Sequence, residues 1–459
     1  MNLVAAVSAG LLSSLAFEPI ALWPFALLGL GIWYRLICRL QLKKRILSSY
    51  LYGLGVLLPT QIWTGVYVGN LPWLILCVGQ ALFFILPAFF VGRNKLNNQI
   101  AFVCSYIVVE LALRTLPFTG FGWSRLGFTQ VNSPLASIYP LFGVVGVSLI
   151  LAWFATIRGL RDFFYPALVV LLAHFIPNPV TLSDTFRIAL IQGGVVNLGL
   201  NFNDKPKEVF LRHVDQTRKS ISAQQVNLIA WPENAVDVDV FKNEDVKQTI
   251  VDLSEELQTP ILIGGVTSSP QPRNQSMLFN PQLAQVYTKR YLTPFGEYLP
   301  MRMLAEKISP YANDIKDFQA GNTPVVFQTN LTNFRALICY ELLDDKFVRE
   351  NTNDFLIIQT NNATFGDTAQ LDQQLNIAQV RALESSRHIP YVSTTGITSL
   401  IEPSGQINKQ LEKFIPATLV ADIQKATGST YAQKLSWIFE PGAIIILLLV
   451  LASRHRGRA

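Results

Sequence analysis

The sequence predicts an α-helical polytopic membrane unit joined to an α/β domain, and three observations lead to this fold class. Half of the 459 residues are hydrophobic and the mean hydropathy is +0.32, which is too apolar for a soluble chain of this length. The apolar residues are concentrated in 1–178 and 436–452, whereas 181–435 has the mixed composition of a globular domain. Charge divides in the same way, because 181–435 holds 23 basic and 27 acidic residues and the rest of the chain holds 14 basic and 4 acidic ones. The excess of positive charge therefore belongs to the membrane part, which argues against nucleic-acid binding.

Eight apolar segments approach the roughly 20 residues that a helix needs to cross a bilayer core of about 30 Å. They are 3–18, 20–37, 47–67, 72–92, 99–116, 135–156, 163–178 and 436–452. The first two nearly touch at Glu18-Pro19, so a hairpin of tilted helices describes them as well as two separate spans. The first segment has no basic leader and no small-residue cleavage motif, and we interpret it as a retained span.

The basic residues outside the α/β domain predict the orientation of these spans. If the N-terminus is cytoplasmic, positive charge gathers in the alternate loops and the tail, as the positive-inside rule requires. These residues are Arg35, Arg39, Lys43, Lys44, Arg45, Arg93, Lys95, Arg158, Arg161, Arg454, Arg456 and Arg458. Arg114 and Arg125 do not fit the pattern. Eight spans place 179–435 on the extracytoplasmic side and end the chain with a span and a basic cytoplasmic tail in 436–459.

Residues 179–435 alternate short β-rich apolar runs with helix-length segments, which indicates an α/β domain with a sheet-rich core. The runs are FRIALIQ, NLIAW, ILIGGV, MLFN, VVF, RALICY, FLIIQT, YVSTT and TSLIEP, and the clearest helical segments are 241–258 and 369–386. The Pro-containing stretch 176–184 is the expected boundary with the membrane unit.

Reactive side chains follow three of the expected strands. Glu233 lies in the loop WPENA, Lys289 and Glu297 lie in YTKRYLTPFGEYLP, and Cys339 ends the run RALICY. The other three cysteines lie in or beside the apolar spans, where a thiol usually acts as a small hydrophobe. Cys339 is alone in its domain, so an intradomain disulfide is impossible and a reactive role has to be weighed.

A nucleophilic thiol needs a base or a positive environment, and the usual partner is histidine. The domain holds only His213 and His388, neither in a motif-like setting, which leaves a carboxylate base with a lysine. Each residue by itself has a more common explanation that involves no catalysis. Cys339 would be a buried structural thiol, Glu233 would cap a loop, and Lys289 would be a solvated strand residue. The scattered histidines lack ligand spacing and Gly264-Gly265 lacks the pattern of a dinucleotide loop, so neither a metal nor a cofactor is predicted.

Residues 187–422 resemble the carbon–nitrogen hydrolase (nitrilase) superfamily, whose Glu-Lys-Cys triad matches Glu233, Lys289 and Cys339. With its membrane flanks, the whole chain resembles the apolipoprotein N-acyltransferase family. The segments that carry this resemblance are WPENA, PFGEYLP, ICYE, NNATFG (361–366), RALE (381–384), TGI (395–397) and TGFGW (119–123). Two positions depart from the family pattern: Thr364 replaces a common tryptophan, and Gly122 replaces a proline.

The resemblance implies a nitrilase-like α-β-β-α sandwich that transfers an acyl chain between lipids in two steps. Glu233 takes the thiol proton, Cys339 attacks an ester of a membrane phospholipid to give a thioester, and Lys289 stabilises the oxyanion. The α-amine of the diacylglyceryl-modified N-terminal cysteine of an apolipoprotein then accepts the acyl chain. This reaction completes bacterial lipoprotein maturation, so the resemblance also implies a multi-pass protein of the bacterial inner (plasma) membrane.

The resemblance also implies supporting residues. Glu297 would orient the lysine or the base, Glu341 would position Lys289 or the acceptor amine, and the backbone N–H of Tyr340 would donate to the oxyanion. For both acids, a purely structural role in a turn is the alternative. The residues implied in substrate binding are Trp231, Asn361, Asn362 and Trp123.

Two other functions have to be compared with acyl transfer. A membrane-anchored amide or nitrile hydrolase would use the same triad with water as the acceptor. A transporter or scaffold would use the domain only for binding, and a transporter usually carries ionisable residues inside its spans. Glu110 is the one clear residue of this kind in the predicted spans, which makes transport the weakest hypothesis.

Overall fold

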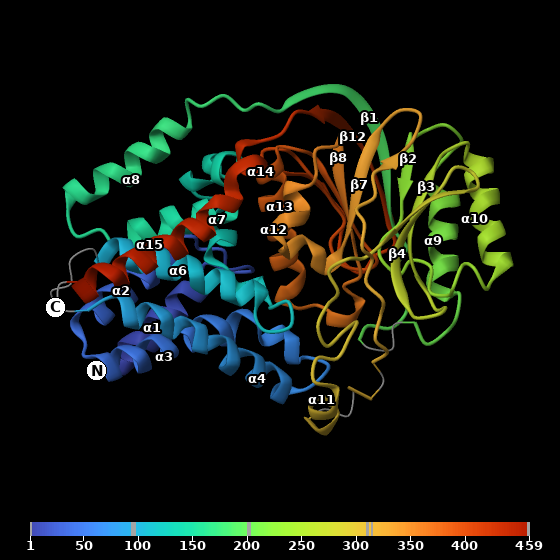
Figure 1. Ribbon diagram of the computed structural model, residues 1–459. Helices are drawn as coiled ribbons and strands as arrows, with labels where there is room; N and C mark the ends of the chain where they lie inside the picture. Colours follow the sequence, from blue (N-terminus) through green and yellow to red (C-terminus); the bar gives the residue numbers. More distant parts are fainter. Residues whose placement is uncertain (1, 93–97, 200–202, 309–311, 314, 457–459) are drawn as a thin grey trace. The chain divides into compact units, whose positions relative to one another are not determined.

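The computed structural model describes residues 2–92, 98–199, 203–308, 312–313 and 315–456. The chain forms two compact units, a helical unit made of Met1–Asn178 with Thr430–Ala459 and an α/β unit made of Pro179–Ser429 (Figure 1). The second boundary was predicted after residue 435 but lies after Ser429. The reason is local: Thr430 caps the short helix α14 (Tyr431–Leu435), which continues through η9 (Ser436–Ile438) into α15 (Phe439–Arg456).

Each of the eight predicted apolar segments contains a helix. The elements of the helical unit that precede α14 are α1 (Asn2–Ser14), α2 (Pro24–Arg39), α3 (Leu42–Thr60), η1 (Ile62–Gly65), α4 (Asn70–Ala81), η2 (Leu82–Ile85), α5 (Leu86–Phe90), α6 (Asn98–Thr115), η3 (Gly122–Ser124), η4 (Leu126–Gln130), η5 (Pro134–Ile138), α7 (Tyr139–Ala155) and α8 (Leu160–Ala173). In the described part of the chain, three stretches are long and apolar enough to cross a membrane: Asn70–Phe90, Pro134–Ala155 and Tyr431–Ser453. Eight spans therefore stay a prediction.

Some of the basic residues that predict orientation lie elsewhere than expected. Helix α3 begins at Leu42, so Lys43, Lys44 and Arg45 belong to its first turns and not to a loop. Arg93, Lys95 and Arg458 lie outside the described residues.

Both arginines that depart from the positive-inside pattern form ion pairs inside the helical unit. Arg114 lies 2.5 Å from the carboxylate of Glu440, and Arg125 lies 3.5 Å from that of Glu110. The Glu110 carboxylate also accepts hydrogen bonds from Tyr106 Oη at 3.0 Å, Ser148 Oγ at 2.6 Å and the backbone N–H of Leu126 at 3.1 Å. The carboxylate of Glu110 is thus paired and hydrogen-bonded inside the helical unit, as buried charges in folded proteins usually are.

The α/β unit contains two six-stranded sheets, with strand orders β12-β1-β2-β3-β4-β5 and β11-β10-β9-β8-β7-β6. The strands are β1 (Thr181–Gln192), β2 (Leu228–Ala230), β3 (Ile261–Thr267), β4 (Arg273–Phe279), β5 (Leu283–Thr288), β6 (Phe327–Gln328), β7 (Asn333–Ile338), β8 (Phe355–Thr360), β9 (Ile389–Ser393), β10 (Ser399–Ile401), β11 (Ile407–Gln410) and β12 (Ala417–Thr427). The helices are α9 (Glu208–Ser220), α10 (Glu244–Leu257), α11 (Arg302–Ile308), α12 (Asp345–Arg349) and α13 (Ala369–Ser385), with the short turns η7 (Cys339–Leu343) and η8 (Ala363–Phe365).

The two sheets pack face to face between two layers of helices, which confirms the predicted α-β-β-α sandwich. Figure 1 shows α12 and α13 on one side of the sheets and α9 and α10 on the other. One apolar core joins α9 and α10 to the first sheet through residues such as Phe210, Ile250 and Ile229, and a second, which includes Leu228 and Ile338, lies between the sheets. Strands β5, β11 and β12 were not among the predicted runs, because polar side chains alternate along them.

The parallel strands decide where the reactive side chains lie. In the first sheet β1, β2 and β3 run parallel, and in the second β7, β8 and β9 run parallel. Loops at the carboxyl ends of parallel strands are the usual place for functional groups in α/β folds.

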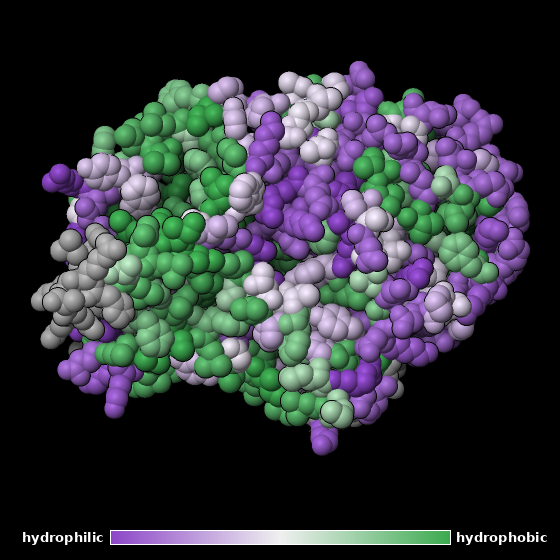
Figure 2. Space-filling view, viewed as in Figure 1, coloured by the Kyte–Doolittle hydropathy of each residue, from purple (hydrophilic) through white to green (hydrophobic). Residues whose placement is uncertain are grey.

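The surfaces of the units also differ: Figure 2 shows a largely hydrophobic surface over the helical unit and a largely hydrophilic one over the α/β unit.

Candidate active site

The three residues of the predicted triad each follow the end of a strand. Glu233 lies in the loop after β2, Lys289 comes directly after β5, and Cys339 is the residue at which β7 changes into the turn η7. Cys339 has a φ of +49°, a left-handed conformation that is uncommon for a residue with a Cβ. The chain therefore turns sharply at the thiol.

Lys289 lies in a buried cluster with two carboxylates. Its Nζ is 2.9 Å from Glu297 Oε2 and 3.6 Å from Glu233 Oε1, and its side chain is 2% exposed. Asn274 Nδ2 donates to both acids, at 2.7 Å to Glu233 Oε1 and 2.8 Å to Glu297 Oε1. The backbone N–H of Thr293 donates to Glu297 Oε2 at 2.8 Å. Glu297 thus contacts the lysine directly, and its implied role in orienting Lys289 stays a prediction.

Burial and charge set the protonation of this cluster. Burial raises the pKa of Glu233, although the nearby Lys289 ammonium lowers it in part. Burial alone would lower the pKa of Lys289, but the carboxylates of Glu297 and Glu233 outweigh it and hold that pKa above its usual value. Lys289 is therefore a fixed positive charge at neutral pH.

The thiol is protonated at neutral pH. Burial, followed by the negative charge of Glu233, raises the pKa of Cys339 to about 12, and the charge of Lys289 acts in the opposite direction. The charges of Glu233 and Lys289 therefore change the pKa of the Cys339 thiol in opposite directions. A thiol in this state needs a general base to become a nucleophile, and Glu233 is the carboxylate with which its charge interacts most strongly.

The loop that carries Glu233 is held to the second sheet. The backbone N–H of Asn361, next to the end of β8, donates to Glu233 Oε2 at 2.9 Å, and Thr394 Oγ1 donates to the Glu233 backbone carbonyl at 2.9 Å. Asn361 is thus brought to the site, through its backbone. Asn362 is 1% exposed, and its Nδ2 donates to Gln370 and Gln374 Oε1, each at 2.8 Å.

Glu341 anchors the backbone around the thiol. Its Oε2 accepts from the N–H of Ile338 at 2.8 Å, and its Oε1 accepts from Tyr287 Oη at 2.7 Å and from the N–H of Arg290 at 2.8 Å. These bonds tie η7 to the segment that carries Lys289. Burial raises the pKa of the Glu341 carboxyl, although the charge of Lys289 lowers it in part. The role implied for Glu341 stays a prediction. The ring of Tyr340 stacks on Tyr291, with centroids 5.2 Å apart.

Two residues implied in substrate binding are buried, each within its own unit. Trp231 has no exposed surface; it packs in the core between the first sheet and α9, and its Nε1 donates to Thr217 Oγ1 at 3.0 Å. The side chain is therefore part of the core, and its implied contact with substrate stays a prediction. Trp123 belongs to the helical unit, where it is buried and its ring stacks on Phe121 with centroids 5.9 Å apart.

Three residues at the site were missed by sequence reasoning. Asn274 joins the two carboxylates, Thr360 Oγ1 lies 3.5 Å from the Cys339 sulfur, and Gln374 Nε2 lies 3.4 Å from it. The available signal was weak: Asn274 lies outside the expected strand runs, and Gln374 lies in an expected helix. Polar residues at such positions are usually taken as the solvated face of the element.

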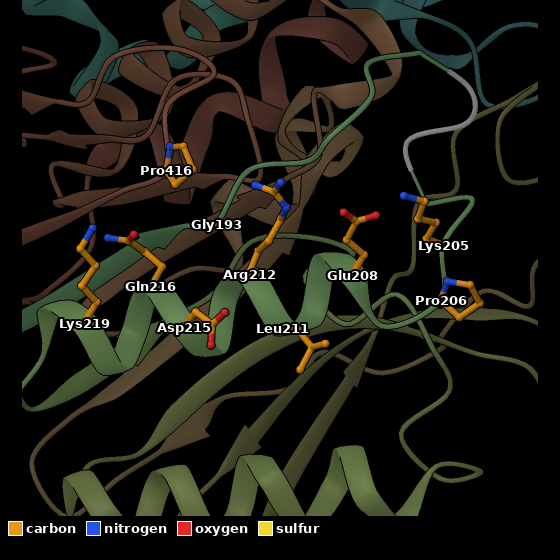
Figure 3. Close-up of a pocket in the computed structure, with 10 residues that line it drawn as sticks. All are labelled: Gly193, Lys205, Pro206, Glu208, Leu211, Arg212, Asp215, Gln216, Lys219 and Pro416. Atoms are coloured by element: carbon orange, nitrogen blue, oxygen red, sulfur yellow. The ribbon is translucent and has the colours of Figure 1, made fainter.

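A groove in the α/β unit lies apart from these residues. It has a volume of about 640 Å³ and runs along α9, with Arg212, Asp215 and Lys219 among its lining residues and none of the triad (Figure 3). Its mixed charges point to no particular ligand. In the described part of the chain, no group of three or more His, Cys, Asp or Glu side chains is placed to hold a metal ion.

Two family profiles match the chain, one in each unit. Residues 9–157 match the family profile "Apolipoprotein N-acyltransferase N-terminal domain", and residues 187–433 match the profile "Carbon-nitrogen hydrolase". Among solved structures, a CN-hydrolase superfamily protein from Xanthomonas campestris is 16% identical, with a TM-score of 0.40 over 57% of this chain and 97% of its own. An amidase of the nitrilase superfamily from Nesterenkonia is 18% identical, with a TM-score of 0.42 over 56% of this chain and 96% of its own.

Similarity to characterised relatives extends over nearly the full chain. The apolipoprotein N-acyltransferase of Mycolicibacterium smegmatis is 30% identical over 99% of this chain and 86% of its own length. That of Pseudomonas syringae is 28% identical over 97% of this chain and 94% of its own length. The chain therefore belongs to the apolipoprotein N-acyltransferase family, and its α/β unit belongs to the carbon–nitrogen hydrolases.

Proposed function

We propose that this chain N-acylates apolipoproteins by a two-step transfer that passes through a thioester at Cys339. The observation that carries the proposal is the site at the three strand ends, where the buried Glu233 and Lys289 interact with the half-buried Cys339. Family membership supports the reaction class, an acyl transfer to lipoproteins at a membrane. The residues of the α/β unit supply the nucleophile, the base and the positive charge for it.

In the first step, Glu233 accepts the proton of the Cys339 thiol as the sulfur attacks the ester carbonyl of a membrane phospholipid. The tetrahedral intermediate collapses with cleavage of the ester C–O bond, and Glu233 returns the proton to the leaving oxygen. The products are a thioester on Cys339 and a lysophospholipid. The raised pKa of Glu233 suits it to both the base and the acid role, because the free energies of its two protonation states are brought closer.

Developing negative charge on the carbonyl oxygen requires a preorganised positive group. Lys289 meets this need because Glu297 and Asn274 hold its surroundings fixed before the substrate arrives. The backbone N–H of Tyr340, which follows the nucleophile directly, is the second proposed donor. A buried, water-poor site makes each of these contributions larger than it would be in water.

In the second step, the α-amine of a diacylglyceryl-modified N-terminal cysteine attacks the thioester. Glu233 takes a proton from the attacking nitrogen, the C–S bond breaks, and the sulfur of Cys339 leaves as a thiolate that is reprotonated by Glu233. Both substrates are lipids, which accounts for an α/β unit of this kind in a membrane protein. We place the protein in the bacterial inner membrane with residues 179–435 on the extracytoplasmic side.

Intact mass measurement of the purified protein tests the covalent intermediate. After mixing with phospholipid, the wild type should gain the mass of one acyl chain and Cys339→Ala should gain none. Cys339→Ser should acylate at least 10²-fold more slowly, because in the same surroundings a hydroxyl is far harder to deprotonate than a thiol, whose unperturbed pKa is only about 8.5. Acylation of the Cys339→Ala protein would show that another residue is the nucleophile.

Addition of a diacylglyceryl lipopeptide to the acylated protein tests the acceptor. The expected products are an N-acylated peptide and the unmodified enzyme, with one lysophospholipid formed per turnover. Release of free fatty acid in place of the N-acylated peptide would favour the rival function, a membrane-anchored hydrolase that uses water as the acceptor.

A further inference from the structure

The carboxamide of Gln374 faces the proposed nucleophile from the adjacent helix. Gln374 lies in α13, has no exposed surface, and places its Nε2 3.4 Å from Cys339 Sγ. That distance is within the range of a hydrogen bond to sulfur, which is longer than one to oxygen. The residue is neither charged nor part of the triad, and its side chain contacts the reacting atom directly.

The other end of the same carboxamide is fixed by four hydrogen-bond donors. Gln374 Oε1 accepts bonds of 2.8 to 3.1 Å, and the donors are Thr360 Oγ1, Asn362 Nδ2, Gln370 Nε2 and Tyr391 Oη. A carboxamide turned by 180° would place its NH₂ group against the NH₂ groups of Asn362 and Gln370, which cannot accept. The orientation with the NH₂ group toward the sulfur is therefore the one that these neighbours allow.

The orientation of Asn362 is fixed in turn. Its Oδ1 accepts from Ser393 Oγ at 2.7 Å, and Ser393 Oγ itself accepts from the N–H of Gly396 at 2.9 Å. The hydroxyl proton of Ser393 is therefore donated to Asn362 Oδ1. With its oxygen on this side, Asn362 directs its NH₂ group toward Gln374. A network satisfied at every position holds a side chain more firmly than isolated bonds do.

From this geometry we infer that Gln374 is a further catalytic residue, one whose Nε2–H donates a hydrogen bond to the sulfur of Cys339 whenever that sulfur carries negative charge. The inference rests on the proposed thioester mechanism. In that mechanism the sulfur is anionic twice: when Glu233 has removed the thiol proton before the C–S bond forms, and when the C–S bond breaks as the amine takes the acyl chain. One donor stabilises both states.

Gln374 has the physical properties that this role requires. Burial and the charge of Glu233 favour the neutral thiol and raise the pKa of Cys339 to about 12, so a nearby donor is needed to offset part of that cost. A neutral donor stabilises the thiolate without forming an ion pair that would make it a poor nucleophile. Thr360 Oγ1 also lies 3.5 Å from the sulfur, but its single hydroxyl proton is shared between Cys339 and Gln374 Oε1.

Gln374→Glu tests the inference with little change in shape. The new carboxylate keeps one oxygen where the four donors need it, and those donors hold it ionised. Its second oxygen replaces the NH₂ group, so the sulfur faces a negative charge in place of a donor. The readout is the rate at which Cys339 is alkylated by iodoacetamide as a function of pH, a reaction in which the thiolate displaces iodide and no lipid takes part.

We expect the Gln374→Glu protein to be alkylated at least tenfold more slowly than the wild type at pH 8 and at pH 9, where the thiolate is the minor form. Gln374→Met, which removes the donor without adding charge, should change both rates in the same direction. Gln379→Glu is the matched control, because Gln379 lies on the same helix and donates to the Gly405 carbonyl at 2.8 Å, and it should behave as the wild type. Cys339→Ala gives the background from the other three cysteines.

Wild-type alkylation profiles in the folded Gln374 variants would overturn the inference. If thermal unfolding showed that neither variant folds, Gln374 would be a structural residue and the inference would fail as well. The outcome is separate from that of the proposed function, because alkylation needs no acyl donor. A slowed alkylation in a protein that forms no thioester from phospholipid would leave Gln374 as a thiolate donor and reject the acyl transfer.

Discussion

Cys339 has two features that each raise the free energy of the folded state. Its half-buried thiol interacts with the carboxylate of Glu233, and its backbone has a φ of +49°. A left-handed conformation at a residue with a Cβ costs on the order of 1 kcal/mol or more and persists where the surroundings impose it. Here Glu341 accepts hydrogen bonds from the N–H of Ile338, next to Cys339, and from the N–H of Arg290.

Lys289→Met should remove the positive charge that the proposed oxyanion requires. Thioester formation is expected to fall by roughly 10²-fold or more, the usual effect of losing one preorganised group of this kind. The two acids would then lie bridged by Asn274 without a cation, so one of them should take up a proton. Labelled phospholipid gives the rate, and a thermal melt shows whether the protein is folded. Glu297→Gln, which keeps the shape and the lysine, should show a smaller loss.

If Lys289→Met formed the thioester at the wild-type rate, the lysine would not be the oxyanion partner. If thioester formation fell equally in the Glu297→Gln protein, the cause would be the geometry of the cluster and not the charge of the lysine.

Strand β3 approaches the loop of Glu233 so closely that one of its residues must be glycine. A Cβ on Gly264 would lie 2.8 Å from the Cα of Glu233, whereas a Cβ on Gly265 would have its nearest contacts at 3.3 Å, one of them to the end of the flexible Met277 side chain. Gly264→Ala should therefore displace the loop and lower acyl transfer at least tenfold, with a loss of stability of about 1–3 kcal/mol. Gly265→Ala is the control from the same strand.

The comparison of these two variants by turnover and by denaturant unfolding locates the effect. Equal activities would mean that the loop of Glu233 tolerates displacement, and that its approach to β3 is unrelated to catalysis.

Helix α9 is joined to the end of β1 through a buried neutral histidine. His213 Nδ1 donates to the Val209 carbonyl at 2.8 Å, and its Nε2 accepts from the N–H of Gly193 at 3.2 Å. Burial lowers the pKa of His213 from 6.5 to about 4. His213 therefore binds a proton below about pH 6.5 in the unfolded chain but only below about pH 4 in the folded chain. The free energy of unfolding falls as the pH drops from 6.5 to 4.

The loss attributable to His213 should reach roughly 3 kcal/mol at pH 4. Denaturant unfolding at several pH values measures it, and the wild type should show a steeper fall than His213→Gln, which does not titrate and keeps an acceptor for Gly193. Parallel curves for the two proteins would mean that His213 is charged in the folded state.

At the scale of the whole molecule, the two units differ in surface as well as in fold. The helical unit exposes many large apolar side chains, whereas the surface of the α/β unit is mostly polar (Figure 2). Exposed apolar surface of this extent is what a helical unit embedded in lipid presents. The orientation of the chain in the membrane then decides on which side the α/β unit works.

Reporter fusions test that orientation. Alkaline phosphatase, which is active only outside the cytoplasm, should be active when fused after Asn178, where the first part of the helical unit ends. It should be inactive when fused after Leu40, between α2 and α3. This pattern follows from the basic residues of the loops, and the reverse pattern would place the α/β unit in the cytoplasm.

The sequence alone determined the two-unit plan, the α-β-β-α sandwich and the family. These conclusions were accessible because they depend on local signals: long apolar segments, apolar runs of strand length, and reactive residues directly after such runs. Glu233, Lys289 and Cys339 could be named for this reason, since each follows a strand end and matches a motif. The same signals placed the boundary near residue 435 six residues too late, because a short polar helix precedes the apolar one.

Tertiary structure decided what surrounds the three named residues. Asn274 and Gln374 reach the site from a strand and a helix whose polar residues look solvated in the sequence, and only packing shows that both side chains are buried against reacting groups. Trp231 shows the opposite case, because its motif suggests a substrate contact but the fold buries it in the core. Burial and side-chain contact depend on residues far apart in the chain, and no local pattern records them.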